Sequence, residues 1–231
     1  MKFILLPGLD GTGDLFEPLL EELNDVGSVE VISYPTDKAL NYSELHELVS
    51  LQLPKNENYV LLGESFSGPI AISIAAESPR DLVGLVLCCS FSKIPNKLLP
   101  ALHPVISLFP VNLVPNKFLS FALLGKWSTP FLESKLRTAI KKVKHHVLSQ
   151  RLKLIESLNS GSNVQAIKIP ILYLAANNDR LVPIRNAMEI KNNNSNVTVE
   201  HLDGPHALLQ TRPKKSALLI SEFVRKIEEK L

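Results

Sequence analysis

Short apolar segments alternate with longer amphipathic segments along most of the chain. The apolar segments are rich in Val, Ile and Leu and predict buried strands at residues 2–6, 29–33, 59–63, 82–89, 169–175 and 197–202. Segments with apolar residues spaced three and four apart predict helices at residues 15–23, 42–52, 67–77, 184–190 and 214–229. Strands that alternate with helices form parallel sheets covered on both faces. The sequence therefore predicts an α/β fold with an open, mostly parallel six-stranded sheet.

One long stretch, residues 91–160, interrupts this alternation after the fourth predicted strand. Residues 129–158 have the apolar periodicity of a cap helix. Residues 98–116 are uncharged and apolar, but four prolines break any regular helix there: Pro100, Pro104, Pro110 and Pro115. A mobile apolar lid is therefore expected instead of a transmembrane segment. We expect a single domain over residues 1–231, with a helical cap or lid inserted at 91–160.

Composition fits one domain with a large core. The chain has 231 residues, of which 45% are hydrophobic and 21% charged, which is enough for one large core and short for two. Cys88 and Cys89 are adjacent on a predicted strand, so we expect buried reduced thiols and neither a redox nor a metal site. The chain opens directly on a strand and shows no secretory signal, so a cytoplasmic location is expected.

The third predicted strand runs into a turn that suits an exposed nucleophile. Residues 60–68 read VLLGESFSG, in which Ser65 lies between Gly63 and Gly68. A serine hydroxyl becomes a useful nucleophile only if it stands clear of the sheet, which requires a sharp turn with small neighbours. The usual pattern is Gly-x-Ser-x-Gly, and this chain has Ser67 at its last position. The segment predicts Ser65 as a catalytic nucleophile, with an ordinary strand-to-helix turn as the alternative.

The last two predicted strands supply an acid and a base in the chain order that such a serine needs. Asp179 lies in the loop after the fifth strand, and His206 follows the sixth. Both then share the carboxyl edge of the sheet with Ser65, where open parallel sheets bind ligands. Asp203 is a rival acid but lies only three residues from His206, and Asp179 could instead form a turn or a helix cap. The remaining histidines do not follow a strand in this order: His46, His103, His145, His146 and His201.

A glycine-rich loop after the first strand suits an oxyanion hole. Residues 7–16 read PGLDGTGDLF, and glycines let the backbone approach a ligand closely. The backbone N–H groups of Leu9 and Phe66 are the expected donors to a developing oxyanion. The loop does not continue as a dinucleotide or P-loop motif, which makes phosphate binding the weaker interpretation.

Four segments at strand ends, PGLDGTG, GESFSG, NNDRLVP and DGPH, resemble in this order those of α/β-hydrolases. The resemblance covers nearly the whole chain except residues 91–160. The first two segments are similar to those of small bacterial hydrolases and of the hydrolase region of plastid phytyl ester synthases. The resemblance implies an α/β-hydrolase fold and a catalytic triad of Ser65, Asp179 and His206. Catalysis by such a triad requires no metal and no cofactor.

Charge is segregated between the insertion and the rest of the chain. Residues 91–156 contain eleven Lys or Arg and two Glu, a net charge of +9 by difference, whereas the whole chain carries +2. A basic cap could attract acyl carrier protein, coenzyme A or an anionic lipid surface, with Lys141, Lys142 and Lys144 as candidates, or it could simply be a solvated helix face. Nucleic acid is the weaker partner, because Trp127 is the single tryptophan and no aromatic set interleaves the basic residues.

These observations lead to one main hypothesis and two alternatives. We expect a serine hydrolase of the carboxylesterase or thioesterase type that cleaves an ester or thioester with a medium or long acyl chain through an acyl-enzyme. The same residues could transfer the acyl group to an alcohol, as in the phytyl ester synthases that the chain resembles. A ligand-binding protein on this fold is the other alternative, because a fold alone does not confer chemistry.

Overall fold

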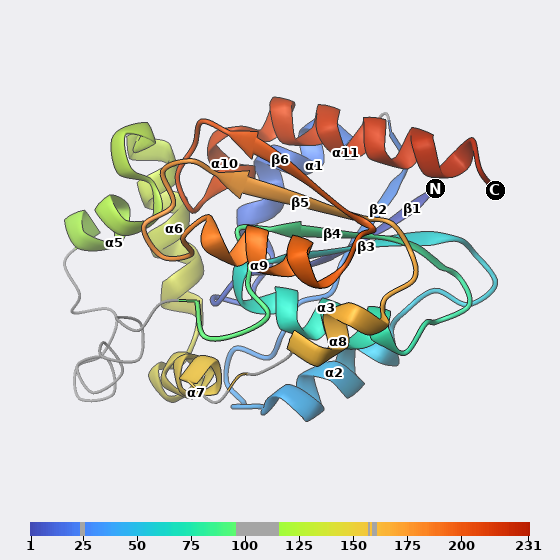
Figure 1. The fold of residues 1–231 in the computed structure, drawn as a ribbon. Coiled ribbons are helices and arrows are strands. Elements are labelled where there is room, and N and C mark those ends of the chain that lie inside the picture. Colours follow the sequence, from blue (N-terminus) through green and yellow to red (C-terminus); the bar gives the residue numbers. More distant parts are fainter. Residues whose placement is uncertain (24–25, 96–115, 157, 159–160) are drawn as a thin grey trace.

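The computed structural model describes residues 1–23, 26–95, 116–156, 158 and 161–231. Six parallel strands form one sheet in the order β2-β1-β3-β4-β5-β6 (Figure 1). The strands are β1 (Lys2–Leu6), β2 (Ser28–Val31), β3 (Tyr59–Glu64), β4 (Leu82–Cys88), β5 (Ile171–Ala176) and β6 (Val197–Leu202). The predicted six-stranded parallel α/β fold is confirmed.

Helices cover both faces of this sheet (Figure 1). One face carries α1 (Glu17–Leu23), α10 (Leu208–Thr211) and α11 (Pro213–Glu228), and the other carries α2 (Tyr42–Ser50), α3 (Gly68–Ala76), α8 (Gly161–Ala166) and α9 (Arg185–Asn193). Side chains alternate along each strand, so Ile4 and Leu6 pack into one apolar core while Phe3 and Leu5 pack into the other. Both predicted helix layers are present, and the short helices α8 and α10 are additions that the periodicity did not reveal.

Three further helices lie beyond the carboxyl ends of the strands, at the end toward which the arrows of β5 and β6 point (Figure 1). They are α5 (Asn116–Leu123), α6 (Pro130–Lys142) and α7 (His145–Glu156), and together we call them the cap helices. Residues 96–115, which include most of the expected apolar lid, lie outside the described residues. In the part of the chain that the structure describes, no helix has the length and apolarity needed to cross a membrane.

The expected single cap helix at residues 129–158 is wrong, because the chain breaks between α6 and α7. Val143 takes an extended conformation, with φ −97° and ψ 129°. The backbone N–H of Lys144 then donates to the carbonyl of Thr36 at 2.7 Å instead of continuing the helix. A contact with the loop after β2 therefore turns the cap, and α7 begins in a new direction.

The sheet order also fixes where a ligand can bind. From β1 the chain crosses to β2 on one side and then to β3 on the other, so the connections diverge between β1 and β3. Parallel sheets form a crevice at the carboxyl ends of such neighbouring strands. The loops after β1 and β3 meet there, under the cap helices.

Candidate active site

Ser65 stands at a strained turn between β3 and α3. Every residue of β3 is buried, and Ser65 directly after it has φ +47°, which an L-residue rarely adopts. Gly68 is required at the start of α3, because an added Cβ would lie 1.6 Å from Oγ of Ser90. The Ser65 carbonyl accepts a hydrogen bond from that Ser90 hydroxyl at 2.7 Å. The helix therefore packs closely against the segment that follows β4, and Ser90 in that segment holds the serine in its turn.

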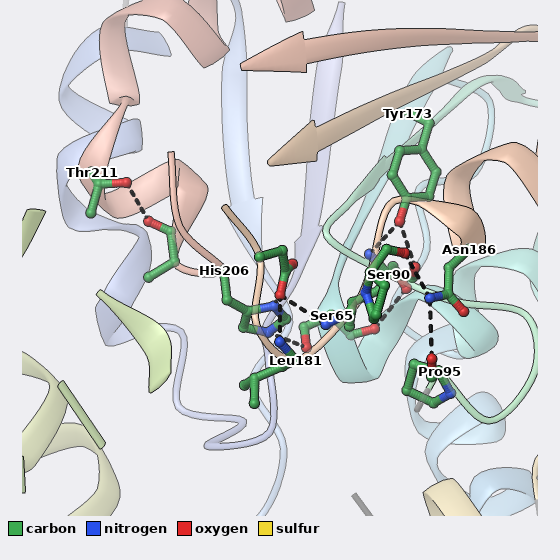
Figure 2. Close-up of polar contacts among 12 residues, drawn as sticks. Ser65, Ser90, Pro95, Tyr173, Leu181, Asn186, His206 and Thr211 are labelled. Atoms are coloured by element: carbon green, nitrogen blue, oxygen red, sulfur yellow. Dashed lines mark hydrogen bonds and ion pairs between the residues drawn. The ribbon is translucent and has the colours of Figure 1, made fainter. Parts of the chain in front are cut away.

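Ser65, His206 and Asp179 form a continuous chain of hydrogen bonds. Oγ of Ser65 lies 2.9 Å from Nε2 of His206, and Nδ1 of the same ring lies 2.8 Å from Oδ2 of Asp179. Figure 2 shows the Ser65 and His206 side chains pointing toward one another from separate loops. The three residues come from the ends of β3, β5 and β6. The structure thus brings together the three residues that the sequence predicted as nucleophile, base and acid.

Asp179 is held so that one oxygen faces the histidine. Its Oδ1 accepts hydrogen bonds from the backbone N–H groups of Leu181 and Val182, both at 2.8 Å, and its side chain is 2% exposed. The rival Asp203 is 63% exposed and accepts a hydrogen bond from Asn178 at 2.9 Å. The turn after β5 therefore orients Asp179, and Asp203 faces solvent.

The charges around His206 favour its protonated form. Burial lowers the pKa of the imidazole, but the charge and hydrogen bond of Asp179, helped by the charge of Glu64, raise it above its ordinary value. Glu64 is itself buried, and desolvation raises the pKa of its carboxyl to about 7. Its Oε1 accepts a hydrogen bond from Nε2 of Gln210 at 3.0 Å. A cation at His206 would therefore be stabilised by the carboxyl groups of Asp179 and Glu64.

The loop after β1 contributes the second part of the site. The Gly8 N–H hydrogen-bonds Glu64, and the Gly8 carbonyl accepts from the N–H of Gly11 at 3.0 Å. Among the described residues, the Leu9 N–H has no protein partner. Leu9 and Phe66 both line the pocket beside Ser65. A free backbone donor next to a nucleophile is the arrangement that an oxyanion hole requires.

Ser67 stands where the usual Gly-x-Ser-x-Gly pattern has its last glycine, and it connects the turn at Ser65 to the loop after β1. Its hydroxyl donates to the carbonyl of Pro7 and lies 2.6 Å from the hydroxyl of Tyr34, which donates to it in turn. Ser67 and Tyr34 are both almost fully buried. A glycine at this position would leave the Pro7 carbonyl and the Tyr34 hydroxyl without these bonds. The serine at this position therefore holds the turn at Ser65 against the loop after β1.

An apolar pocket of about 210 Å³ opens at Ser65 and His206. Its wall away from the triad comes mostly from the cap helices and is almost entirely hydrocarbon. The lining residues from these helices are Phe118, Leu119, Ala122, Leu123, Leu136, Ile140, Leu148, Leu152 and Ile155. A surface of this kind suits an acyl chain and offers little to a polar group.

Among the described residues, His206 is the histidine that lines this pocket. His46 pairs with Glu77 at 3.0 Å, His146 lies 3.0 Å from the carbonyl of Asp37, and His201 is exposed on β6. His145 belongs to α7, and His103 is outside the described residues.

Two buried free cysteines lie near the triad. Cys88 ends β4 and Cys89 follows it with φ +47°. The ligating atoms of Cys89, Asp179 and His206 lie within 4.8 Å of one another, a spacing that could hold a metal ion. Asp179 and His206 are hydrogen-bonded to each other, and burial raises the pKa of the Cys89 thiol well above its ordinary value. We therefore interpret this cluster as the triad beside a neutral thiol.

The three candidate lysines of the cap differ in their surroundings. Nζ of Lys142 lies 2.5 Å from Oδ2 of Asp14, so this side chain ties α6 to the turn after the first loop. Lys135 forms a second such pair with Glu17. Lys141 and Lys144 are exposed. Lys142 is exposed too, but of the three it is the one that forms an ion pair among the described residues.

Arg151 is a residue of this site that the sequence analysis missed. It lies on α7, is 2% exposed, and donates to the backbone carbonyls of Leu9, Asp10 and Pro35. A signal was present in the sequence, because Arg151 falls on the apolar stripe of α7 four residues after Val147 and four before Ile155. A charge on an apolar stripe needs buried partners.

Comparison with known protein families identifies the chain's relatives. The family model described as Hydrolase_4, serine aminopeptidase S33, matches residues 41–209. Over 210 residues the chain is 25% identical to a pimeloyl-(acyl-carrier protein) methyl ester esterase of Pseudoalteromonas atlantica, covering 80% of this chain and 78% of that protein. Over 241 residues it is 23% identical to the biotin biosynthesis bifunctional protein BioHC of Cellvibrio japonicus, covering 95% of this chain but only 47% of that protein.

Two further comparisons extend this result. The chain is 25% identical over 216 residues to the chloroplastic phytyl ester synthase 1 of Arabidopsis thaliana, covering 78% of this chain and 30% of that protein. A bromoperoxidase from Bacillus anthracis superposes with a TM-score of 0.86 at 14% identity, over 97% of this chain and 91% of that one. An enol-lactonase from Burkholderia xenovorans superposes with a TM-score of 0.83 at 12% identity, over 97% and 91%. At such identities the superpositions establish the fold alone.

Proposed function

The chain belongs to the α/β-hydrolase family described as serine aminopeptidase S33 and is a carboxylesterase-type hydrolase, and on this premise we propose that it cleaves esters or thioesters of medium or long acyl chains with Ser65, Asp179 and His206 as its catalytic triad. The observation that carries the proposal is the hydrogen-bonded chain from Ser65 Oγ through His206 to Asp179, which opens onto an apolar pocket. An amino-terminal residue of a peptide would present a charged amine, and the wall that the cap helices contribute to this pocket offers it only hydrocarbon.

In the proposed first half-reaction, Oγ of Ser65 attacks the acyl carbonyl while Nε2 of His206 removes the hydroxyl proton. The carboxylate of Asp179 stabilises the imidazolium that forms. The N–H groups of Leu9 and Phe66 donate to the tetrahedral oxyanion. As the carbon–oxygen or carbon–sulfur bond to the leaving group breaks, His206 returns the proton to the departing alcohol or thiol, and an acyl-enzyme remains on Ser65.

In the second half-reaction, water attacks the acyl-enzyme carbonyl. His206 removes a proton from this water and then gives it to Oγ of Ser65 as the acid is released. The acyl chain lies against the hydrocarbon wall of the cap helices throughout. No step needs a metal or a cofactor.

A series of p-nitrophenyl esters from acetyl to palmitoyl tests the substrate class. We expect kcat/KM to rise with acyl length to a maximum at a medium or long chain, because the pocket removes methylene groups from water. Ala122→Trp, which fills the pocket from α5, should lower palmitoyl ester hydrolysis by about tenfold or more and leave acetyl ester hydrolysis within about threefold.

Ala166→Trp on α8 is the matched control, because Ala166 is exposed and does not line the pocket. It should leave the whole series unchanged. An unchanged chain-length profile for Ala122→Trp would contradict the assignment of this pocket to the acyl chain.

We also propose an acyl carrier protein as the donor of the acyl group. Support comes from the net charge of +9 in residues 91–156 and from two relatives, one whose name specifies an acyl-carrier protein ester and one named for biotin biosynthesis. A basic cap would raise the rate of association with an anionic carrier protein. Coenzyme A and anionic lipid remain the alternative anionic partners.

Charge reversal on the cap tests this partner. Lys141→Glu together with Lys144→Glu should lower kcat/KM for an ester carried on acyl carrier protein by about tenfold at low salt, because these exposed charges steer association. Hydrolysis of p-nitrophenyl esters should stay within about twofold. Lys142 is left in place because its pair with Asp14 fastens the cap.

Lys214→Glu with Lys215→Glu is the control, since it makes the same change in net charge at exposed positions of α11. If both double variants lose carrier-bound activity equally, the effect belongs to net charge and the cap is not the docking surface.

Acyl transfer to an alcohol is the second candidate, and the similarity to phytyl ester synthase 1 favours it. The same acyl-enzyme would then be attacked by an alcohol hydroxyl in place of water. Product analysis with a long-chain alcohol in the reaction separates the two, because transfer gives a new ester and hydrolysis gives the free acid.

A further inference from the structure

The guanidinium of Arg151 is buried beneath the loop after β1, although it belongs to a cap helix. Nη1 donates to the Leu9 carbonyl at 2.9 Å and to the Asp10 carbonyl at 2.6 Å. Nη2 donates to the Pro35 carbonyl at 2.9 Å. The guanidinium carbon lies 5.6 Å from the centre of the Tyr34 ring, within the range of a cation–π contact. One side chain of α7 therefore joins two loops of the sheet.

The loop is shaped around this side chain. Gly11 has φ +69°, and a Cβ added there would lie 2.5 Å from Nη1 of Arg151. Any other residue at position 11 would both strain the backbone and displace the guanidinium. The glycine thus provides the space that the arginine occupies.

The peptide that carries the Leu9 N–H is held on both sides, by Gly11 at its own carbonyl and by Arg151 at the carbonyl of the following peptide. On one side of this N–H, the Gly8 carbonyl accepts from Gly11 at 3.0 Å. On the other side, the Leu9 carbonyl accepts from Arg151. With both neighbouring carbonyls held, rotation of the peptide between Gly8 and Leu9 is restricted and its N–H keeps one direction.

We propose that Arg151 is a positioning residue that sets the direction of the Leu9 N–H and thereby couples the cap to oxyanion stabilisation. The inference rests on the proposed function. It adds to that function because α7 also lines the pocket, with Leu148, Leu152 and Ile155. Lys144 and His146 anchor the start of the same helix to the carbonyls of Thr36 and Asp37. A single helix therefore contacts the acyl chain and holds the loop that acts on the carbonyl.

The test compares Arg151→Met, Arg151→Lys and the control Lys153→Met, which removes an exposed charge from the same helix. We expect Arg151→Met to lower kcat by about 10²-fold with KM within about threefold, because a misplaced oxyanion donor acts on the transition state and not on the bound ester. Arg151→Lys should be intermediate, since an ammonium can donate hydrogen bonds but cannot form the guanidinium fork. Lys153→Met should match the wild type.

Binding of an alkylboronic acid supplies a readout that folding alone would not change. The boronate forms a tetrahedral adduct with the nucleophilic serine. Its affinity should therefore follow kcat: lowest in Arg151→Met, intermediate in Arg151→Lys and unchanged in Lys153→Met. All values are referred to the fraction of protein with the wild-type near-ultraviolet circular dichroism. A purely structural role would lower that fraction and leave kcat and boronate affinity per folded molecule unchanged, which would overturn the proposal.

Dependence of ester hydrolysis on Ser65 separates the proposed function from the role of Arg151. A wild type whose ester hydrolysis does not depend on Ser65 would overturn both. An active, Ser65-dependent wild type with Arg151→Met and Arg151→Lys within threefold of it in kcat would overturn the role of Arg151 alone.

Discussion

Replacing Ser65 by Ala is expected to lower kcat for ester hydrolysis by about 10⁴-fold to 10⁶-fold. The loss is large because the acyl-enzyme needs a covalent bond to Oγ, and the neighbouring oxyanion donors and pocket retain only the catalysis that they provide without a nucleophile. The measurement is the initial rate with the p-nitrophenyl ester that the wild type prefers. Mass spectrometry after treatment with a fluorophosphonate should find the label on Ser65 in the wild type.

Ser221→Ala, a substitution on α11 at a residue that does not line the pocket, is the matched control and should retain wild-type kcat. If Ser65→Ala hydrolyses the ester within tenfold of the wild type, the proposed mechanism is wrong. If the wild type is silent with every ester and carrier-bound substrate and takes no label, the binding-protein alternative gains support.

Asp179→Asn is expected to lower kcat by about 10³-fold to 10⁴-fold, the second largest effect. Oδ1 of Asp179 accepts from the N–H groups of Leu181 and Val182, so the amide oxygen of asparagine would occupy that place. The amide NH₂ would then face Nδ1 of His206 and force the tautomer with a proton on Nε2. That ring could not remove the proton of Ser65. Asp203→Asn, the matched control, should stay within about threefold.

The pH profile gives this prediction a second readout. His206 must be neutral to act as the base, and its pKa is raised, so kcat/KM of the wild type should fall as the pH decreases through a value above about 6.5. The loss of Asp179 removes the charge and the hydrogen bond that raise this pKa, so the acid limb should move to lower pH. Desolvation raises the pKa of the Glu64 carboxyl to about 7, so the acid limb is expected to report both groups. An acid limb that does not move would contradict the pairing of Asp179 with His206.

The juxtaposition of Ser65, Asp179 and His206 could be predicted from the sequence because each follows a strand, and parallel strands bring their carboxyl ends to one edge. The strands themselves were predicted because buried parallel strands are short, continuous apolar segments. The choice between Asp179 and Asp203 was harder, since both follow strands on neighbouring loops. The turn in which Asp179 binds the N–H groups of Leu181 and Val182 distinguishes them, and that turn is a local arrangement that composition does not reveal.

The cap was predicted less well because contacts from distant loops decide its shape. The apolar spacing through Leu136, Ile140, Val143 and Val147 continues without interruption, yet the helix breaks at Val143 because Lys144 binds the Thr36 carbonyl. Arg151 was overlooked for a related reason. Its partners lie more than a hundred residues away along the chain, and no pattern within α7 specifies them.

The insertion has a consequence for engineering this chain. The stretch that carries α5, α6 and α7 leaves the sheet after β4 and returns before β5, while Ser65, Asp179 and His206 all lie outside it. A chimera that received this stretch from another hydrolase would keep the reacting atoms and change the wall around the acyl group. Without an arginine at the place of Arg151, however, two backbone carbonyls of the loop after β1 and one of the loop after β2 would lose their donor. Successful grafts should therefore be those in which the donor stretch supplies that arginine. Where it does not, the loop after β1 should be exchanged together with the stretch.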